Sequence, residues 1–270
     1  MSTQEKNSGY TAEEQMVVSA ARQIRDGDVV YVGVGLPMRA GLLARRLHAP
    51  RCTIIIENGI VRSDAFPLPA GTDTLGSQSF SDQLSGLFHV MCLGQAGHID
   101  TGFLGGGQID RYGNVNDTCA GDYRKPSHRW PGSGGGNDIM SFCGRTVVVL
   151  EQKKIRFPEK VDFNTCPGYY DGKPNRREEA GLRPATGPSA VITDLAEYTF
   201  VDRELTVNSV HAGVGVTLDK VKAEVGWDIR VSPNLNDTPP PTREELDTLR
   251  RWVRPSFAPL PPTPKPGTSS

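Results

Sequence analysis

The sequence lacks the cysteine patterns that build metal centres. None of its cysteines belongs to a CxxC pair, and no cysteine and histidine have a spacing that fits a zinc site. Their number is odd and their spacings are wide, which favours buried free thiols in a reducing cytosol and no bound metal. The residues concerned are Cys52, Cys92, Cys119, Cys143 and Cys166.

The sequence also lacks an excess of charge of either sign and any long hydrophobic run. Its 30 basic and 31 acidic residues give a net charge of −1, which does not indicate a nucleic-acid-binding surface. Apolar runs such as the one at 146–150 are as long as a strand and far too short to span a membrane. The N-terminus is polar and has no apolar segment of a secretory signal. We therefore expect a cytoplasmic protein that binds neither nucleic acid nor membrane.

What the sequence contains is an alternation of strand and helix patterns. Thr11 and Glu14 form the capping-box pattern that opens a helix. Strand patterns at 28–32 and 53–56 flank a helix pattern at 38–47, and this order indicates a βαβ unit with a parallel sheet. A chain of 270 residues can bury one sizeable core. The predicted fold class is α/β, an open and mostly parallel sheet flanked by helices.

Further patterns extend this fold toward the C-terminus. We expect strands at 99–104, 146–150, 190–193 and 199–201, and helices at 81–89, 218–225 and 242–253. No internal repeat and no strong linker interrupts residues 11–254, which we interpret as one domain. Residues 1–10 are predicted to be disordered, and the proline-rich residues 255–270 to be an extended or disordered tail.

Glu57 is the first candidate functional residue. It directly follows the three isoleucines 54–56, so it lies at the C-terminal end of a predicted parallel strand. Ligands of open parallel sheets bind beyond these strand ends. The apolar approach would limit hydration of the carboxylate and make it a better nucleophile. A second interpretation stays open at this point, because Asn58 and Gly59 are a turn signal and Glu57 can be an ordinary turn residue.

Two glycine-rich segments are the other candidates. Gly105, Gly106 and Gly107 follow a predicted strand, and the segment 132–138 contains four more glycines. Backbone N–H groups with no side chain in the way can bind a phosphate or the oxyanion of a tetrahedral intermediate. Each segment alone can equally be a tight turn. Neither fits the dinucleotide GxGxxG fingerprint or the GK[ST] of a nucleotide-binding P-loop.

Seven stretches, taken in order, resemble one known family. From about residue 28 to residue 253 the chain is similar to the β-type subunit of family I CoA transferases, in the branch of the glutaconate CoA-transferase β-subunit. The stretches are GVGLP (33–37), LHAP (47–50), ENG (57–59), DTGFLGGGQIDRYGNVN (100–116), GSGGGNDI (132–139), FPEKVDFNTCPGY (157–169) and VITDLAEYTF (191–200).

The resemblance implies a role for each candidate residue. Glu57 matches the nucleophile that forms a covalent glutamyl-CoA thioester, and Gly134 and Gly135 match the glycine pair that stabilises the oxyanion. Asn58 either orients Glu57 or completes its turn. A further set of residues is expected either to line the CoA channel or only to support the fold around it. These residues are Gly105, Gly106, Gly107, Gln108, Asn114 and Asn116. The CoA thioester is expected as substrate, with no permanently bound cofactor and no metal.

The resemblance also implies partners. An α-type CoA-transferase subunit is expected, in a heterotetramer or a larger assembly, with acyl-CoA and a carboxylic acid as substrates. Arg62, Arg124 and His128 are candidates for CoA phosphates, although exposed basic residues are usually only solvated. Two alternatives within the same fold are an acyl-CoA hydrolase and a ring-opening hydrolase of the steroid-degradation type, of which Glu57 argues against the second. A non-catalytic ligand-binding protein is a third alternative.

Overall fold

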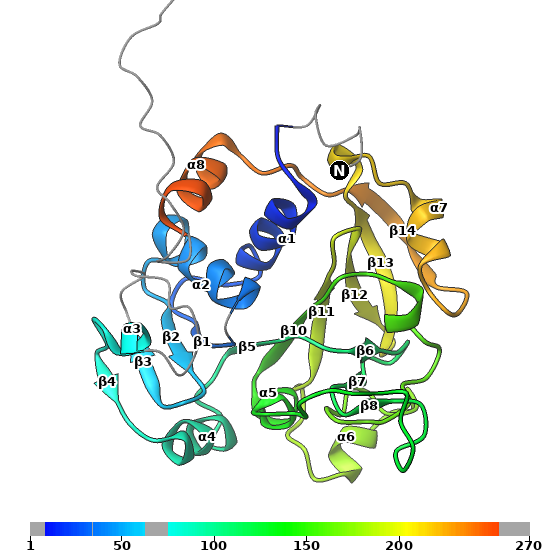
Figure 1. Ribbon diagram of the computed structural model, residues 1–270, viewed down its shortest axis with the longest axis horizontal. Coiled ribbons are helices and arrows are strands. Elements are labelled where there is room, and N and C mark those ends of the chain that lie inside the picture. Colours follow the sequence, from blue (N-terminus) through cyan, green and yellow to red (C-terminus); the bar gives the residue numbers. More distant parts are fainter. Residues whose placement is uncertain (1–8, 34, 63–74, 254–270) are drawn as a thin grey trace, which may run out of the picture.

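The computed structural model describes residues 9–33, 35–62 and 75–253, which are arranged in layers around a ten-stranded sheet (Figure 1). The strand order is β14-β13-β12-β11-β10-β5-β1-β2-β3-β4. The disorder predicted at the two ends falls largely on residues 1–8 and 254–270, which lie outside the described residues. Within the described part, Tyr10 is buried and packs against Gly213.

Five neighbouring strands at the centre of the sheet run parallel, as the sequence predicts. The pairs β2–β1, β1–β5, β5–β10 and β10–β11 are all parallel. Because Val32 pairs with Ile56, the C-terminal ends of β1 and β2 meet at the same edge of the sheet. The bounds are β1 (Val29–Val32), β2 (Thr53–Ile56), β5 (Thr101–Leu104), β10 (Arg145–Val149) and β11 (Pro188–Ile192).

Antiparallel strands extend the sheet on both sides. Beyond β2 lie β3 (Ile60–Arg62) and β4 (Gln83–Leu84), and beyond β11 lie β12 (Ala196–Val201) and β13 (Glu204–Val210), each antiparallel to its inner neighbour. The outermost strand β14 (Arg230–Asp237) is parallel to β13. The sheet is therefore mixed at its flanks and parallel at its centre, which confirms the predicted fold class.

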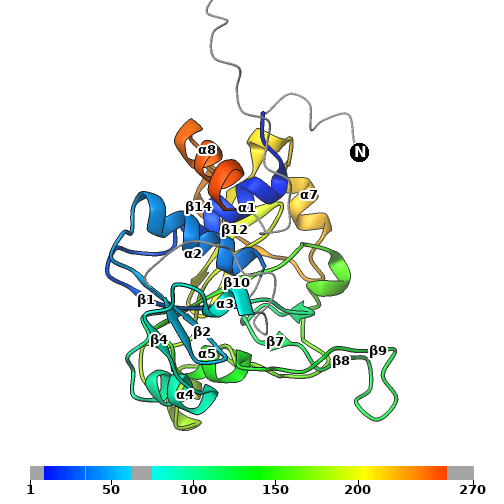
Figure 2. The ribbon, with the colours of Figure 1, turned by 60° about the vertical axis from the view of Figure 1, so that its left-hand side comes forward.

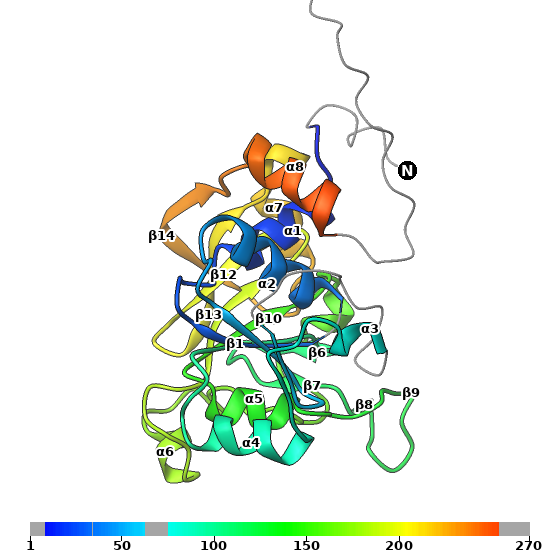
Figure 3. The same ribbon diagram turned by 90° about the vertical axis from the view of Figure 1, so that its left-hand side faces the viewer.

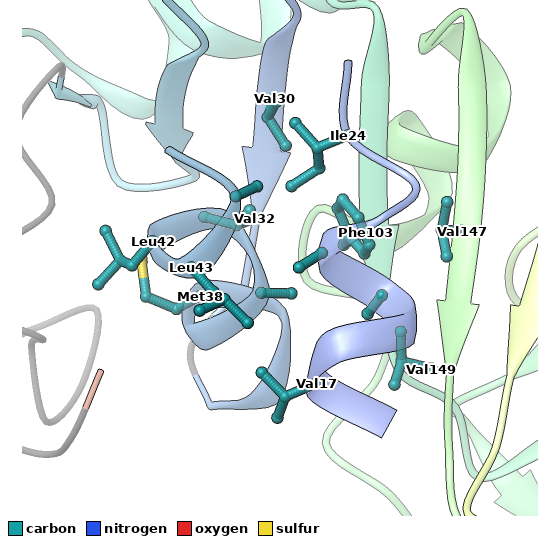
Figure 4. Close-up of a cluster of buried hydrophobic side chains, with 14 of the residues drawn as sticks. Val17, Ile24, Val30, Val32, Met38, Leu42, Leu43, Phe103, Val147 and Val149 are labelled. Carbon is teal, nitrogen blue, oxygen red and sulfur yellow. The ribbon is translucent and has the colours of Figure 1, made fainter. Parts of the chain in front are cut away.

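Helices cover both faces of the central strands. In Figure 3, α1 (Ala12–Ala21), α2 (Leu36–Leu47) and α8 (Arg243–Trp252) lie above the strands, and α4 (Leu87–Gln95) and α5 (Gly136–Phe142) lie below them. Side chains alternate between the faces along β1. Val30 and Val32 join the core under α1 and α2, which Figure 4 shows, and Tyr31 joins the core on the α4–α5 side.

Paired side chains hold the two ends of the described chain together. At the start of α1, Thr11 Oγ1 accepts from the Glu14 N–H at 3.1 Å and Glu14 Oε2 accepts from the Thr11 N–H at 2.9 Å, the predicted capping box. Arg22 binds Glu245 at 2.7 Å, and Arg250 binds Glu14 at 2.6 Å. Helix α8 is therefore fixed on α1 although more than 200 residues separate them in the sequence.

The helix predicted at 81–89 begins later than expected. Residues 83–84 form β4, and α4 starts at Leu87. The cause is a tertiary contact, since the Ser85 N–H and Ser85 Oγ both donate to the Gly59 carbonyl, at 2.8 and 2.9 Å. This pairing with the turn after β2 is stronger than the local helical preference of the segment.

Two short hairpins follow β5. The first consists of β6 (Gln108–Ile109) and β7 (Val115–Asn116), and the second of β8 (Cys119–Ala120) and β9 (His128–Arg129). The β8–β9 hairpin projects from the body of the molecule in both Figure 2 and Figure 3. The remaining short elements are α3 (Leu75–Gln78), η1 (Lys154–Arg156), α6 (Arg176–Glu179), η2 (Ala212–Val214) and α7 (Leu218–Ala223).

Candidate active site

Glu57 is the first residue after β2, in a tight turn at the C-terminal edge of the parallel strands. The turn is closed by a hydrogen bond from the Gly59 N–H to the Ile56 carbonyl, at 3.0 Å. Gly59 has φ +103°, and a Cβ at this position would overlap the carbonyl group of Ser85. The two interpretations of Glu57 are thus compatible, because a turn residue at this edge is also a carboxylate placed where ligands bind.

The second glycine segment brings a backbone donor to Glu57. The Gly135 N–H donates to Glu57 Oε2 at 3.3 Å, across 78 residues of sequence. A Cβ on Gly135 would lie 3.1 Å from this oxygen and 2.9 Å from Met91 Cε, and a Cβ on Gly134 would lie 3.6 Å from the oxygen. Glycine at 135 is what allows the backbone to approach the carboxylate this closely. The structure therefore places Glu57, Gly134 and Gly135 together.

Tyr31 and Met91 complete this site, and neither was predicted. Tyr31 comes from β1, is 2% exposed, and its hydroxyl donates to Met91 Sδ at 3.7 Å. Burial, followed by the nearby charge of Glu57, raises the pKa of Tyr31 far above its usual value. The sequence did carry a signal for Tyr31, because its hydroxyl is a polar atom within the apolar predicted strand at 28–32. For Met91 the sequence carries no such signal.

The first glycine segment lies at the same edge of the sheet, directly after β5. Gly105 is exposed and Gly107 is buried. The Gly107 N–H donates to the Asn116 carbonyl and to Asp117 Oδ1, both at 2.9 Å, so this donor is already used within the protein. Gly106 faces Val115, since a Cβ there would lie 2.8 Å from Val115 Cγ1.

Gln108 and Asn116 are buried and hydrogen-bonded to each other. Asn116 Nδ2 donates to Gln108 Oε1 at 2.7 Å and to the Cys119 carbonyl at 2.7 Å. Gln108 Nε2 donates to Asp162 Oδ2 at 2.8 Å. These side chains connect the β6–β7 hairpin to the segment 161–170. Contact of either residue with CoA stays a prediction.

Asn114 connects the same hairpin to the same segment. Its Oδ1 accepts from the Gly168 and Tyr170 N–H groups, at 3.0 and 3.1 Å, and its Nδ2 donates to Asp110 at 2.9 Å. Asp110 is buried beside it, and this burial raises the pKa of the carboxyl against the opposing effect of the Asn114 hydrogen bonds. Asn114 is 3% exposed, so in this chain it is held among protein groups.

The segment 161–170 in turn supports the glycine loop beside Glu57. Asn137 Nδ2 donates to the Thr165 carbonyl at 2.8 Å, and a Cβ on Gly136 would lie 3.1 Å from Cys166 Sγ. A chain of contacts therefore leads from the buried amides of the β6–β7 hairpin to the backbone that carries Gly135.

The remaining candidates are spread over the molecule. Asn58 is half-buried in the turn after Glu57, and its orienting role stays a prediction. Arg62 is 1% exposed, whereas Arg124 and His128 are exposed on the projecting β8–β9 hairpin.

A cavity of about 1040 Å³ opens beside the β6–β7 hairpin, but Glu57 does not line it. Its wall includes Asp110, Arg111, Tyr112, Glu159, Lys160 and Tyr170.

The cysteines of this chain are free thiols, four of them buried and Cys92 half-buried. Among the described residues, no three potential metal-binding side chains form a group. In the same parts of the chain, every helix is too short or too polar to cross a bilayer.

Comparison with known proteins identifies the family of this chain. A family model described as Coenzyme A transferase matches residues 13–224. The 3-oxoadipate CoA-transferase B-subunit of Pseudomonas knackmussii is 38% identical over 90% of this chain and 93% of that protein. The glutaconate CoA-transferase B-subunit of Acidaminococcus fermentans is 34% identical over 91% of this chain and 96% of that protein.

A solved structure gives the same result. The crystal structure of glutaconate coenzyme A-transferase from Acidaminococcus fermentans superposes with a TM-score of 0.85 at 30% identity, over 94% of this chain and 99% of that chain. The chain belongs to the coenzyme A transferase family, and it is a CoA transferase. Glu57, Gly134 and Gly135 all lie within the matched residues.

Proposed function

We propose that this chain is the subunit that carries the nucleophile of a CoA transferase, with Glu57 forming a glutamyl-CoA thioester. The observation that supports this most strongly is the contact between the Gly135 N–H and Glu57 Oε2, at 3.3 Å, at the C-terminal edge of the parallel strands. A carboxylate at this edge with a backbone donor on one oxygen has its other oxygen available for attack.

The proposed reaction has two steps that are then reversed. A Glu57 oxygen attacks the acyl carbon of acyl-CoA, a C–O bond forms, the C–S bond breaks, and CoA leaves as a thiolate. The thiolate attacks Cδ of Glu57, a C–S bond forms, and cleavage between Cδ and the bridging oxygen releases the first carboxylate. A second carboxylate reverses both steps and departs as the new acyl-CoA. No proton or electron is gained or lost overall.

The Gly135 N–H has a defined task in this sequence. When the thiolate attacks Cδ of Glu57, negative charge develops on the oxygen that remains bound, which we assign to Oε2. The Gly135 N–H donates to this atom already in the resting protein. Oε1 is then the oxygen that attacks the acyl carbon and leaves with the first carboxylate. Loss of one such donor lowers kcat about 100-fold in other acyl-transfer enzymes.

The names of the relatives support the proposed partner and substrates. Both of the similar proteins named above are B-subunits, which supports an α-type partner subunit in a heterotetramer or a larger assembly. Their names refer to 3-oxoadipate and glutaconate, both dicarboxylic acids, and this favours a dicarboxylic acid as one substrate here. A reaction without metal or permanent cofactor and a cytoplasmic location remain part of the proposal.

Covalent trapping tests the assignment of Glu57. The complex with its α-type partner is incubated with acyl-CoA and then with borohydride, which reduces a glutamyl thioester to an alcohol. Peptide mass spectrometry is expected to find the reduced side chain at position 57, and to find none without acyl-CoA or in the Glu57→Gln variant. The proposal would be refuted if a complex with full turnover gave no reduced side chain at position 57 after acyl-CoA and borohydride.

The acceptor requirement separates the proposed transferase from a thioester hydrolase of the same fold. Free CoA is measured with and without a carboxylic acid in the reaction. For a transferase we expect turnover of acyl-CoA to depend on the acid. Release of CoA at an equal rate without any acid would favour the hydrolase, in which water attacks the anhydride.

A further inference from the structure

The hydroxyl of Tyr31 lies beside Glu57, and among residues 9–33, 35–62 and 75–253 it is bonded to no strong hydrogen-bond acceptor. The position that a Cβ on Gly135 would occupy is 3.1 Å from Glu57 Oε2 and 3.4 Å from the Tyr31 hydroxyl oxygen. Both oxygens therefore face the same small space over the Gly135 backbone. The partner of the hydroxyl is Met91 Sδ, at 3.7 Å, and a thioether sulfur is a weak acceptor.

Tyr31 is also fixed in place and protonated. The ring is 2% exposed and packs in the core between β1 and the helices α4 and α5. Burial and the charge of Glu57 raise the pKa of Tyr31, so the group is a neutral O–H donor at neutral pH. A buried hydroxyl that faces a carboxylate without bonding to it is positioned to respond when charge on that carboxylate changes.

We propose that Tyr31 is a second oxyanion donor, whose hydroxyl turns from the Met91 sulfur to Glu57 Oε2 while the thiolate attacks Cδ. The inference rests on the proposed thioester at Glu57. The Gly135 N–H and the Tyr31 O–H then bind the same oxygen from two directions. The hydroxyl keeps its proton throughout, and its contribution is a hydrogen bond that is strong only when Oε2 carries the full charge of the tetrahedral intermediate.

The test is the rate of thioester formation in the Tyr31→Phe variant of the αβ complex. In a single turnover with acyl-CoA, we expect this rate and kcat to fall about 100-fold, while KM for acyl-CoA stays within about two-fold. A rate within about two-fold of the unchanged complex would overturn the inference, and so would a loss that appears only in KM.

Tyr198→Phe is the matched control. Tyr198 is equally buried and donates to Gln152 Oε1 at 2.6 Å, on β12, which three other strands separate from β1 in the sheet. Loss of the Tyr198 hydroxyl should lower thermal stability and leave the rate of thioester formation unchanged. An equal loss of rate in both variants would mean that Tyr31 acts only through the packing of the core, which would overturn the inference.

A second variant covers the case in which Tyr31→Phe does not fold. Replacement of Tyr31 by 3-fluorotyrosine keeps the ring and the hydroxyl and makes the O–H a stronger donor. We expect faster thioester formation with an unchanged KM, and no change in rate would overturn the inference. Failure of the proposed function is separate, because it would show as a missing adduct at Glu57 in the unaltered complex.

Discussion

A methyl group on Gly135 would lie 2.9 Å from Met91 Cε and 3.1 Å from Glu57 Oε2. The end of a methionine side chain can move aside. The carboxylate must shift slightly to relieve its contact, and the Gly135 N–H bond to it is already long at 3.3 Å, so we expect this shift to weaken that bond. The absence of a side chain at Gly135 thus allows the candidate nucleophile Glu57 to keep its position beside the Gly135 N–H.

The Gly135→Ala variant should therefore lose activity with little loss of stability. We expect kcat of the αβ complex to fall about 100-fold, the effect of one lost oxyanion donor. Gly41→Ala is a suitable control, because a Cβ there makes ordinary contacts of 3.5 Å with Ile54 and Val32 inside α2. This control should keep its activity and gain about 1 kcal/mol of stability from helix propensity. An active Gly135→Ala enzyme would contradict the expectation.

His211 is a buried residue whose titration should affect the pH dependence of stability. It is 1% exposed, and burial lowers the pKa of its ring to about 4, with the Asp194 backbone acting in the opposite sense. Its ordinary pKa is 6.5. Between these two values the unfolded chain binds a proton that the folded chain does not bind, so stability falls as the pH falls from 6.5 toward 4.

The His211→Gln variant should remove this part of the pH dependence. At neutral pH both states of the parent are mostly unprotonated at this residue, so titration of His211 then contributes little. By pH 4 the parent should have lost about 3 kcal/mol relative to the variant, as measured by urea unfolding across the pH range. Parallel curves for the two proteins would show that folding leaves the pKa of His211 unchanged.

At the scale of elements, the β6–β7 hairpin acts as a support for the loop that carries Gly135. Its buried amides hold the segment 161–170, and that segment contacts the start of α5 through Thr165 and Cys166. The sequence predicted Asn114 and Asn116 near the active site and left open whether they contact CoA or support the fold. Their burial and their hydrogen bonds favour support.

The Asn114→Ala variant distinguishes these two roles. It leaves the buried N–H group of Gly168 and the half-buried N–H group of Tyr170 without their acceptor, so stability should fall by about 2–3 kcal/mol in urea unfolding. Asn236→Ala, at an exposed asparagine, should change stability by less than about 0.5 kcal/mol. An unchanged stability together with a raised KM for acyl-CoA would instead identify Asn114 as a CoA contact.

At the scale of the whole molecule, the two ends of the described chain pack against each other. Leu249 and Val253 of the C-terminal region are each 1% exposed in the core under α1 and α2. The ion pairs of Arg22 with Glu245 and of Arg250 with Glu14 lie at the same junction. Helix α8 thus packs as part of the core, and the domain boundary near residue 254 stays a prediction.

Two truncations test this boundary. A chain that ends at residue 254 should keep its melting temperature, because the proline-rich tail is predicted to contribute no core contacts. A chain that ends at residue 241 also loses two buried apolar side chains, each worth roughly 1.5–3 kcal/mol, and should melt at a clearly lower temperature. Equal melting temperatures for the two truncations would contradict the assignment of α8 to the core.

Sequence patterns by themselves determined the fold class, the parallel centre of the sheet, the capping box of α1 and the position of Glu57 at the end of β2. These features depend on short-range order, since periodicity, turn residues and caps act within a few residues of chain. The family resemblance added Gly134 and Gly135 as neighbours of Glu57, and the hydrogen bond from Gly135 agrees with that expectation.

Only the tertiary structure decided which distant groups meet. Strand β3 forms by antiparallel pairing with β2 and β4, and the late start of α4 depends on the contact between Gly59 and Ser85. Tyr31 reaches Glu57 because β1 and β2 are neighbours in parallel register. Such contacts result from burial summed over the whole core, and no local pattern carries them. The turn after β2 could therefore be predicted from the sequence, whereas the position of the Tyr31 hydroxyl beside the Glu57 carboxylate could be found only from the tertiary structure.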